Sequence, residues 1–283
     1  MFTGFMVNTW IVATMVAAVA GFAGFFVVIR RSSFAAHVLP LAAFPGAAAA
    51  SLLGVSQILG LVAFAGLGVA GIGQLGRRDR HEVATALCLV GLLALGTLFL
   101  SMTREYSQGV YALLFGEVLG ISTSELLPVA VVCATALAML TLSFRPLLLD
   151  STSPELAAAL GVSSRRVGLQ FLAVLALSTA MVLPVVGALL VFSLMVGPAS
   201  AARSLTDRPF VAALLSVWIS VVTVWVAIAL SYLSNWPVGF FVGVLGVVSY
   251  SSGRLYRRAG RKAIEKPGGA PRPIYGPGSR AMS

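Results

Sequence analysis

The sequence predicts an all-α polytopic membrane protein, and three observations support this fold class. Of the 283 residues, 59% are hydrophobic and only 10% are charged, whereas a soluble domain carries about 25% charged residues. The mean hydropathy is +0.99. The apolar residues also come in blocks of roughly twenty, the length that a helix needs to cross about 30 Å of hydrocarbon. The chain therefore leaves no room for a sizeable soluble domain.

The apolar blocks are expected to form about nine transmembrane helices. The first follows an N-terminus, residues 1–10, without Lys or Arg, and it is too long for the core of a signal peptide, so we interpret it as a retained span. The third is rich in glycine, which suits close helix packing. Pro184 and Gly187 separate the sixth from the seventh, but they could also kink one long helix, which would leave eight spans. The expected spans are 9–29, 34–53, 57–75, 83–102, 125–145, 166–183, 186–202, 210–230 and 236–252.

Basic residues set the expected orientation. With nine spans, every Lys and Arg except Arg104 falls on one side of the membrane, and the positive-inside rule makes that side cytoplasmic. The C-terminus is then cytoplasmic and the N-terminus lies outside. We expect residues 1–252 to form a transmembrane domain and residues 253–283 to form a basic, disordered cytoplasmic tail, because the tail is rich in Pro and Gly past Pro267. The tail could bind anionic membrane lipid. Topology explains its charge, so no nucleic-acid partner is expected.

Two ionisable residues are candidates for a substrate pathway. His37 lies inside the second span, and an imidazole at membrane depth is costly enough to suggest a functional position. It could equally be a packed histidine bonded to a neighbouring helix. Glu117 lies in the apolar, glycine-broken segment 106–124, which could be a re-entrant or interfacial piece. For Glu117 we favour a position at the water interface over one facing a pore.

The segment between the fifth and sixth spans contains a short helix with clear ends. Ser153 can cap it, Pro154 suits its first position, Glu155 faces its positive end, and Gly161 ends it. A cytoplasmic helix of about two turns in this place could receive a push from an ATPase. An ordinary capped connector has the same signature.

The sequence carries no motif of an enzyme active site. Its two Lys residues both lie in the tail and neither follows a Gly-x-x-x-x-Gly loop, so the chain has no P-loop with which to bind ATP. It also has no HExxH and no GxSxG. Cys88 and Cys133 are isolated inside predicted spans and fit apolar packing better than a metal or disulfide site. We therefore expect a chain that is not an enzyme and that binds no cofactor itself.

Taken as a whole, residues 5–252 resemble the permease subunits of the ABC-3 family, which are bacterial importers of manganese, zinc and iron. The resemblance rests on the order and spacing of several local patterns. These patterns are 24–34 at the first cytoplasmic turn, Phe44-Pro45-Gly46, Leu114-Phe115-Gly116, 153–162, 186–191 and 198–202.

The resemblance implies a homodimer in the bacterial cytoplasmic membrane, with the substrate pathway between the two copies. It also implies two cytoplasmic ABC ATPase subunits, which use ATP and Mg, and an extracytoplasmic solute-binding protein. On this pattern the helix at 153–161 couples the chain to the ATPase. The expected coupling residues are Ser153, Pro154, Glu155, Ala157, Ala158 and Gly161, and the expected pathway residues are His37, Leu41, Pro45, Gly46 and Glu117.

The expected pathway departs from the family pattern at one important pair. Family members that import Mn or Zn typically carry Asp and, four residues later, His just before the Pro-Gly of the second span, so that both lie on one helical face. Here these positions read His37 and Leu41, which leaves His37 as the expected metal ligand. A neutral imidazole supplies no negative charge to a dehydrated divalent cation.

The expected function is therefore that of a divalent-metal permease for Mn, Zn or Fe. Two alternatives stay open. One is a permease for a metal chelate or haem, and the other is a membrane scaffold that has lost transport.

Overall fold

The computed structural model describes residues 4–75, 81–102, 123–187 and 190–264, and these ranges contain helices and no strands. The predicted all-α class is confirmed. The helices are α1 (Gly4–Ile29), α2 (Ser33–Leu53), α3 (Gln57–Leu75), α4 (His81–Ser101), α6 (Thr123–Leu142), α7 (Phe144–Thr152), α8 (Pro154–Ala159), α9 (Ser164–Val186), α10 (Val191–Leu205), α11 (Pro209–Ser234) and α12 (Val238–Ile264).

Each of the nine predicted apolar segments corresponds to one of these helices, but a count of nine spans is not confirmed. Within the described ranges, six helices are long and apolar enough to cross a membrane, or seven if α6 and α7, which meet at a bend of 54°, count as one broken span. Helices α4 and α10 fall outside this set, and α10 is only 15 residues long. The predicted break between the sixth and seventh segments is present, because α9 continues through Pro184 and ends before Gly187, whose φ is 91°.

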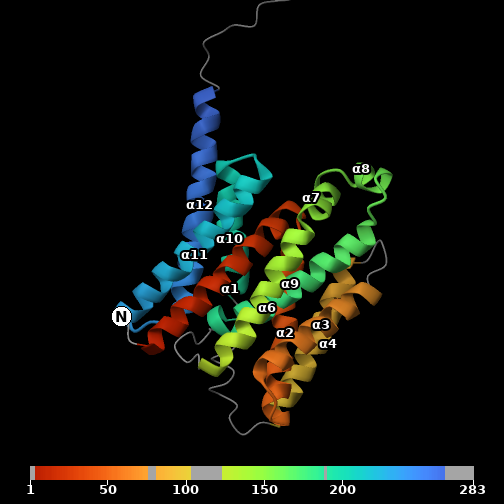
Figure 1. Cartoon of the computed structure of the whole chain (residues 1–283), viewed down its shortest axis with the longest axis vertical. Coiled ribbons are helices and arrows are strands. Elements are labelled where there is room, and N and C mark those ends of the chain that lie inside the picture. The colour runs from red at the N-terminus through yellow and green to blue at the C-terminus, as the bar shows by residue number, and fades with distance from the viewer. Residues whose placement is uncertain (1–3, 76–80, 103–122, 188–189, 265–283) are drawn as a thin grey trace, which may run out of the picture.

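Helix α1 lies at the centre of the bundle and is contacted from several sides (Figure 1). It packs against α10 and α11 on one side and against α6 and α9 on the other. Helices α2, α3 and α4 form a second group, which is joined to the rest mainly through α9. An apolar sequence on all sides of α1 suits this position, because a helix without a polar face is normally buried. Phe25 and Phe26 of α1 are fully buried in the core.

Small residues allow the helices to approach closely. Gly46 of α2 and Gly60 of α3 face each other so closely that a Cβ atom added to either would overlap the carbonyl oxygen of the other. A Cβ atom added to Gly197 of α10 would likewise overlap the backbone of Gly246 in α12. In a membrane, where apolar side chains gain little by leaving lipid, such contacts are a main source of helix association. At Gly60 the contact with Gly46 confirms the prediction that glycines of the third segment serve helix packing.

Helix α12 is longer than predicted. Its helical turns continue to Ile264, so the predicted boundary at residue 252 lies inside the helix, and 253–264 is not a disordered tail. The physical reason is local. Leu255, Arg257 and Arg258 are good helix formers, and no proline follows until Pro267. Figure 1 shows this end of α12 extending beyond the rest of the bundle. The remainder of the predicted tail, 265–283, lies outside the described residues.

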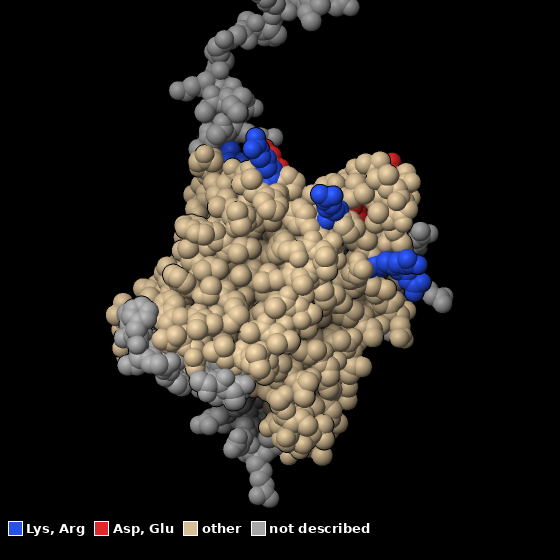
Figure 2. All heavy atoms as spheres, in the orientation of Figure 1, with Lys and Arg blue, Asp and Glu red and all other residues tan. Residues whose placement is uncertain are grey.

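The charged residues of the visible face gather at one end of the molecule (Figure 2). We call this the basic end. It comprises the C-terminal ends of α1, α10 and α12, together with α7, α8 and the start of α9. Its described basic residues are Arg30, Arg31, Arg145, Arg165, Arg166, Arg203, Arg208, Arg254, Arg257 and Arg258.

Candidate functional site

His37 lies near the basic end of α2, on a face of the helix that this chain leaves exposed. It is the fifth residue of α2, about 6 Å along the axis from Ser33 at a rise of about 1.5 Å per residue. Its ring meets the edge of Phe192 of α10, with centroids 5.7 Å apart and planes at 85°. It makes no hydrogen bond to another described residue. The imidazole nitrogens are thus open to a ligand or to a second copy of the chain.

The other predicted pathway residues of α2 differ in their surroundings. Leu41, one turn beyond His37, is half-buried. Pro45 and Gly46 are buried in helix contacts, Pro45 against Gly96 of α4 and Gly46 against Gly60 of α3. The structure therefore brings His37 and Leu41 to neighbouring places on α2, and it places Pro45 and Gly46 where α2 packs on its neighbours. The fifth predicted pathway residue, Glu117, lies outside the described residues.

Within one chain, the described residues provide no set of metal ligands around His37. The described side chains contain no group of three or more His, Cys, Asp or Glu residues that could hold a metal. Since transition metals in proteins usually need several such donors, a cation at His37 would need donors from a second copy, from the solvent or from segments beyond the described residues.

The predicted coupling segment is a separate short helix at the basic end. In α8, Pro154 occupies the first turn with Glu155, and Ala157 donates its backbone N–H to the Ser153 carbonyl at 3.0 Å. Ser153 stands at the N-cap, but its side chain makes no capping hydrogen bond. Gly161 follows the helix with φ of 77°. It closes the C-terminus as a Schellman motif, in which the Val162 N–H reaches the Ala157 carbonyl at 2.9 Å.

Helix α8 has one packed side and one free apolar side. Ala157 is fully buried and anchors the helix to the chain. Ala158 is exposed, and two leucines, Leu156 and Leu160, are 51% and 65% exposed. These two leucines give the outer side of α8 and its C-terminal end an apolar surface beside the exposed Glu155.

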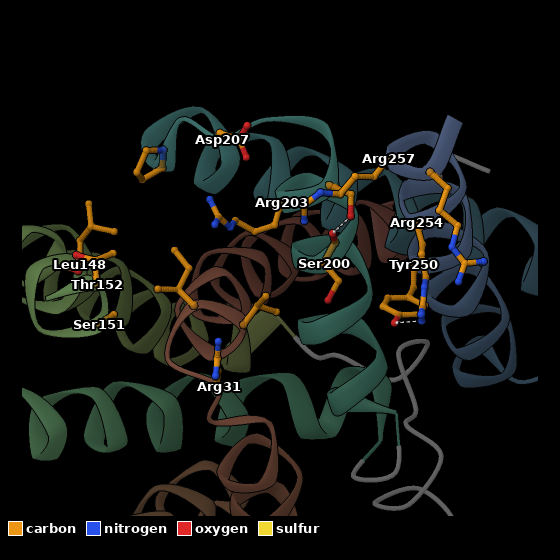
Figure 3. Close-up of a pocket in the computed structure, with 15 residues that line it drawn as sticks. Arg31, Leu148, Ser151, Thr152, Ser200, Arg203, Asp207, Tyr250, Arg254 and Arg257 are labelled. Carbon is orange, nitrogen blue, oxygen red and sulfur yellow. Dashed lines mark hydrogen bonds between the residues drawn. The ribbon is translucent and has the colours of Figure 1, made fainter. Parts of the chain in front are cut away.

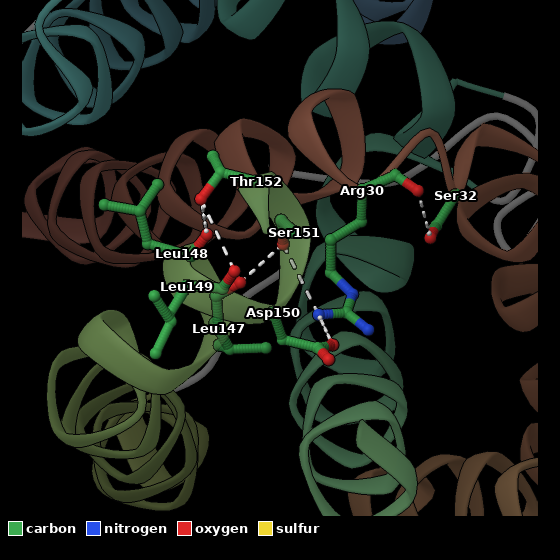
Figure 4. Close-up of polar contacts among 8 residues, drawn as sticks. All are labelled: Arg30, Ser32, Leu147, Leu148, Leu149, Asp150, Ser151 and Thr152. Atoms are coloured by element: carbon green, nitrogen blue, oxygen red, sulfur yellow. Dashed lines mark hydrogen bonds and ion pairs between the residues drawn. The ribbon is translucent and has the colours of Figure 1, made fainter. Parts of the chain in front are cut away.

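Two contacts connect α8 to the central helix α1 by way of α7. The first is an ion pair between Arg30, just after α1, and Asp150 of α7, with Nη1 2.9 Å from Oδ2 (Figure 4). The Arg30 guanidinium also lies over the ring of Phe171 in α9, 5.2 Å from the centroid, a cation–π arrangement. The Ser151 hydroxyl is 3.4 Å from the same Arg30 nitrogen.

The second contact is a cluster of aromatic rings around Phe144, the first residue of α7. Its ring is stacked parallel to Phe25 at 6.2 Å and meets the edge of Phe26 at 5.4 Å, both in α1. Phe22 of α1 lies 6.0 Å away. Aromatic pairs at these separations are attractive beyond their apolar area. Helix α7 is thus fixed to α1 at its start by aromatic rings and near its end by the ion pair.

Sequence reasoning did not identify the residues of this connection. Asp150 follows three leucines, 147–149, and a carboxylate after an apolar run is a signal that a positive partner is near. Arg30 follows the first predicted span, where the positive-inside rule accounts for a basic residue without any side-chain partner. Nothing local to either residue indicates the other, because 120 positions separate them.

Comparisons with known proteins agree with this architecture. The sequence model of the ABC 3 transport family matches residues 3–251. The manganese transport system membrane protein MntC of Listeria innocua is 26% identical over 234 residues, which cover 82% of this chain and 83% of the relative. The chelated iron transport system membrane protein YfeC of Yersinia pestis is 29% identical over 207 residues, 72% of this chain and 70% of the relative.

A solved structure shares the fold. PsaBC from Streptococcus pneumoniae in complex with Fab superposes with a TM-score of 0.82 at 21% identity, covering 92% of this chain and 96% of that chain. The expected resemblance to ABC-3 permeases is confirmed by the family match over most of the sequence, and the chain belongs to the ABC 3 transport family.

Proposed function

We propose that this chain is the membrane-spanning permease subunit of an ATP-driven importer whose substrate is a divalent metal ion. Membership of the ABC 3 transport family and the likeness to a manganese transport membrane protein support the class of substrate. The lack of a P-loop in the sequence supports a division of labour in which a separate subunit hydrolyses ATP.

The proposed assembly is a homodimer with two ABC ATPase subunits at the basic end and a solute-binding protein at the opposite end. The positive-inside rule supports a cytoplasmic position for the basic end, and α12 would then carry the C-terminus into the cytoplasm. The protein would be a multi-pass component of a bacterial cytoplasmic membrane. The exposed face of α2 that carries His37 is where a second copy would complete the pathway.

The observation that carries the proposal is the form of α8. A helix with a buried anchor at Ala157 and exposed leucines on its outer side is suited to dock in a groove of an ATPase. The Arg30–Asp150 pair and the Phe144 rings would pass movement of α8 to α1, the helix at the centre of the bundle. A closing motion of the ATPase pair could thereby tilt the spans.

A metal chelate or haem is the second candidate substrate, and the site chemistry favours it in one respect. Two copies of His37 would offer imidazoles without any carboxylate, a poor set of ligands for a bare Mn²⁺ and a better one for softer ions or for a metal already held by a chelator. The relative from Yersinia pestis carries the name of a chelated iron transport protein.

Reconstitution tests the proposal and separates the two substrates. The chain would be purified with an ABC ATPase subunit and a solute-binding protein from the same organism, placed in liposomes, and supplied with ATP. ATP-dependent accumulation of Mn²⁺, Zn²⁺ or Fe²⁺, measured by elemental analysis, is the expected result, whereas haem absorbance or uptake of iron only as a chelate would support the second candidate. Failure of the chain to bind any ATPase subunit would remove the importer and leave a scaffold.

A further inference from the structure

A pocket of about 800 Å³ opens at the basic end, apart from both His37 and α8. It lies where the ends of α1, α7 and α10 meet the start of α11 and the second half of α12 (Figure 3). Its described lining includes five arginines and one acidic residue. These are Arg31, Arg203, Arg254, Arg257, Arg258 and Asp207.

The positive charge of this pocket is not neutralised by the described chain. None of the five arginines forms an ion pair with another described residue. The ion pair at the basic end joins Arg30 to Asp150, and neither of these residues lines the pocket. Five guanidinium groups therefore share a concave site with a single carboxylate, and their mutual repulsion favours an anion between them. Arg254 donates from Nη1 to the hydroxyl of Tyr250, one turn earlier in α12, at 3.1 Å.

The chemistry of the lining narrows the class of anion. The planar fork of a guanidinium matches the oxygens of a phosphate group and can bind it through two parallel hydrogen bonds. Apolar residues at the end of α1, Val28 and Ile29, line the same pocket, and they suit the non-polar part of a phosphate ester. A volume of about 800 Å³ is ample for such a group, because ligand pockets commonly measure about 300–1,000 Å³.

We propose that the arginine pocket binds a phosphate group, carried either by the headgroup of an anionic phospholipid or by free phosphate. The proposal concerns a site distinct from the transport pathway and does not depend on the identity of the transported substrate. A pocket at the ends of the helices, with apolar residues beside arginines, offers contacts both to the phosphate and to the adjoining non-polar part of a phospholipid.

Paired arginine variants test the proposal on the full chain. The pocket variant carries Arg203→Gln and Arg254→Gln. The control carries Arg165→Gln and Arg166→Gln, two exposed arginines at the start of α9 that do not line the pocket. Both variants lose the same charge. Equal circular dichroism spectra and equal elution volumes would establish that all three proteins are folded.

Two probes distinguish the sources of the phosphate. Native mass spectrometry in phosphatidylcholine micelles doped with phosphatidylglycerol measures bound lipid, and the shift of the unfolding temperature with inorganic phosphate measures the free ion. We expect the pocket variant to bind about tenfold more weakly than the wild type and the control, since charge-assisted hydrogen bonds are lost. Loss of only the lipid signal assigns the site to a headgroup, and loss of only the phosphate-induced shift assigns it to a soluble anion.

Two results would overturn the proposal. In one, the wild type binds neither probe, which would leave the arginines to an acidic surface of a protein partner. In the other, the pocket variant and the control bind the probes equally, which would show that overall charge, and not this pocket, attracts them.

Discussion

Arg30 and Asp150, which are 120 residues apart in the sequence, form an ion pair that joins the end of α1 to α7. Their side chains are only 15% and 5% exposed, so water and salt screen the pair weakly. Helix α7 leads into α8 through Ser153 alone. No long loop separates α8 from the ion pair that joins α7 to the central helix of the bundle.

Replacing Asp150 by Asn should destabilise the protein by about 3 kcal/mol, because removing one partner of a buried pair leaves the other charge without compensation. The measurement is thermal or denaturant unfolding of the full chain in detergent. The double variant with Arg30→Gln should recover part of the loss, since it no longer buries an unpaired charge.

Glu155→Gln is the matched control, because Glu155 is an exposed carboxylate in the neighbouring helix with no ion pair among the described residues. Its stability should stay within about 0.5 kcal/mol of the wild type. If Asp150→Asn proved as stable as Glu155→Gln, the pair would contribute nothing to holding α7 on α1.

The helices were predictable from the sequence because their signal is local. Each of the nine apolar segments corresponds to a helix of the structure, and the break at Gly187 and the stop at Gly161 follow from the backbone freedom of glycine. The end of α12 was missed for a related reason. Hydropathy marks where a chain leaves the membrane, whereas the helix continues for as long as its residues favour helix, here to Ile264.

The contacts between helices were not predictable, because they depend on which helices become neighbours. The residue pairs Arg30–Asp150 and Gly46–Gly60 join different helices, and no local pattern connects their members. Gly46 was expected in the pathway on the basis of a family motif. Its position in the structure shows a packing contact, since only a residue without a side chain fits against Gly60.

Gly46→Ala tests this packing role. A Cβ atom at residue 46 would overlap the backbone of Gly60, which cannot turn aside as a flexible side chain could. Forcing α2 and α3 apart should lower the free energy of unfolding by about 2 kcal/mol, as overpacking typically does. Unfolding of the purified chain in one detergent, followed by circular dichroism, measures the effect.

Gly66→Ala provides the control for Gly46→Ala within α3. Gly66 has open space where the Cβ atom would be placed, so the substitution should be neutral or should stabilise the helix by up to about 1 kcal/mol. Equal stability of the two alanine variants would contradict the close contact between α2 and α3.

Ala158→Arg tests α8 as the coupling helix. Because Ala158 is exposed, the arginine should not disturb folding, but it would place a charged side chain on the surface proposed to dock on the ATPase. Expression and unfolding temperature should match the wild type, while ATP-driven uptake in liposomes falls by roughly tenfold, which corresponds to about 1.4 kcal/mol. Ser164→Arg, at an exposed position in α9, should leave uptake unchanged.

Ala157→Arg, one residue earlier in α8, should affect folding, unlike Ala158→Arg. Ala157 is fully buried, so Ala157→Arg should lower the yield of folded protein and not only the coupling. Normal uptake by Ala158→Arg would exclude this surface of α8 from the interface.

His37→Ala tests whether the exposed imidazole binds substrate or only packs on Phe192. We expect uptake to fall by roughly tenfold, about 1.4 kcal/mol, with unchanged expression, because the side chain is exposed and its one ring contact is at an edge. Phe34→Ala removes another exposed side chain one turn earlier on α2 and should change uptake much less. Unchanged kinetics in His37→Ala would assign the residue to packing.

The double variant with His37→Asp and Leu41→His asks which substrate the pathway accepts. It introduces a carboxylate and an imidazole one turn apart on α2, near enough to share a cation. If the pathway carries bare divalent ions, Mn²⁺ uptake should rise by several-fold, because the pair adds a negatively charged oxygen ligand for the cation. The pair His37→Asn and Leu41→Gln, which has similar shape without the carboxylate or imidazole, should lower uptake.

A second outcome would point to the other substrate. In it, the Asp/His pair gives no gain in Mn²⁺ uptake and also loses uptake of an iron chelate. That result would show that the native imidazole serves a metal that enters already bound to its carrier.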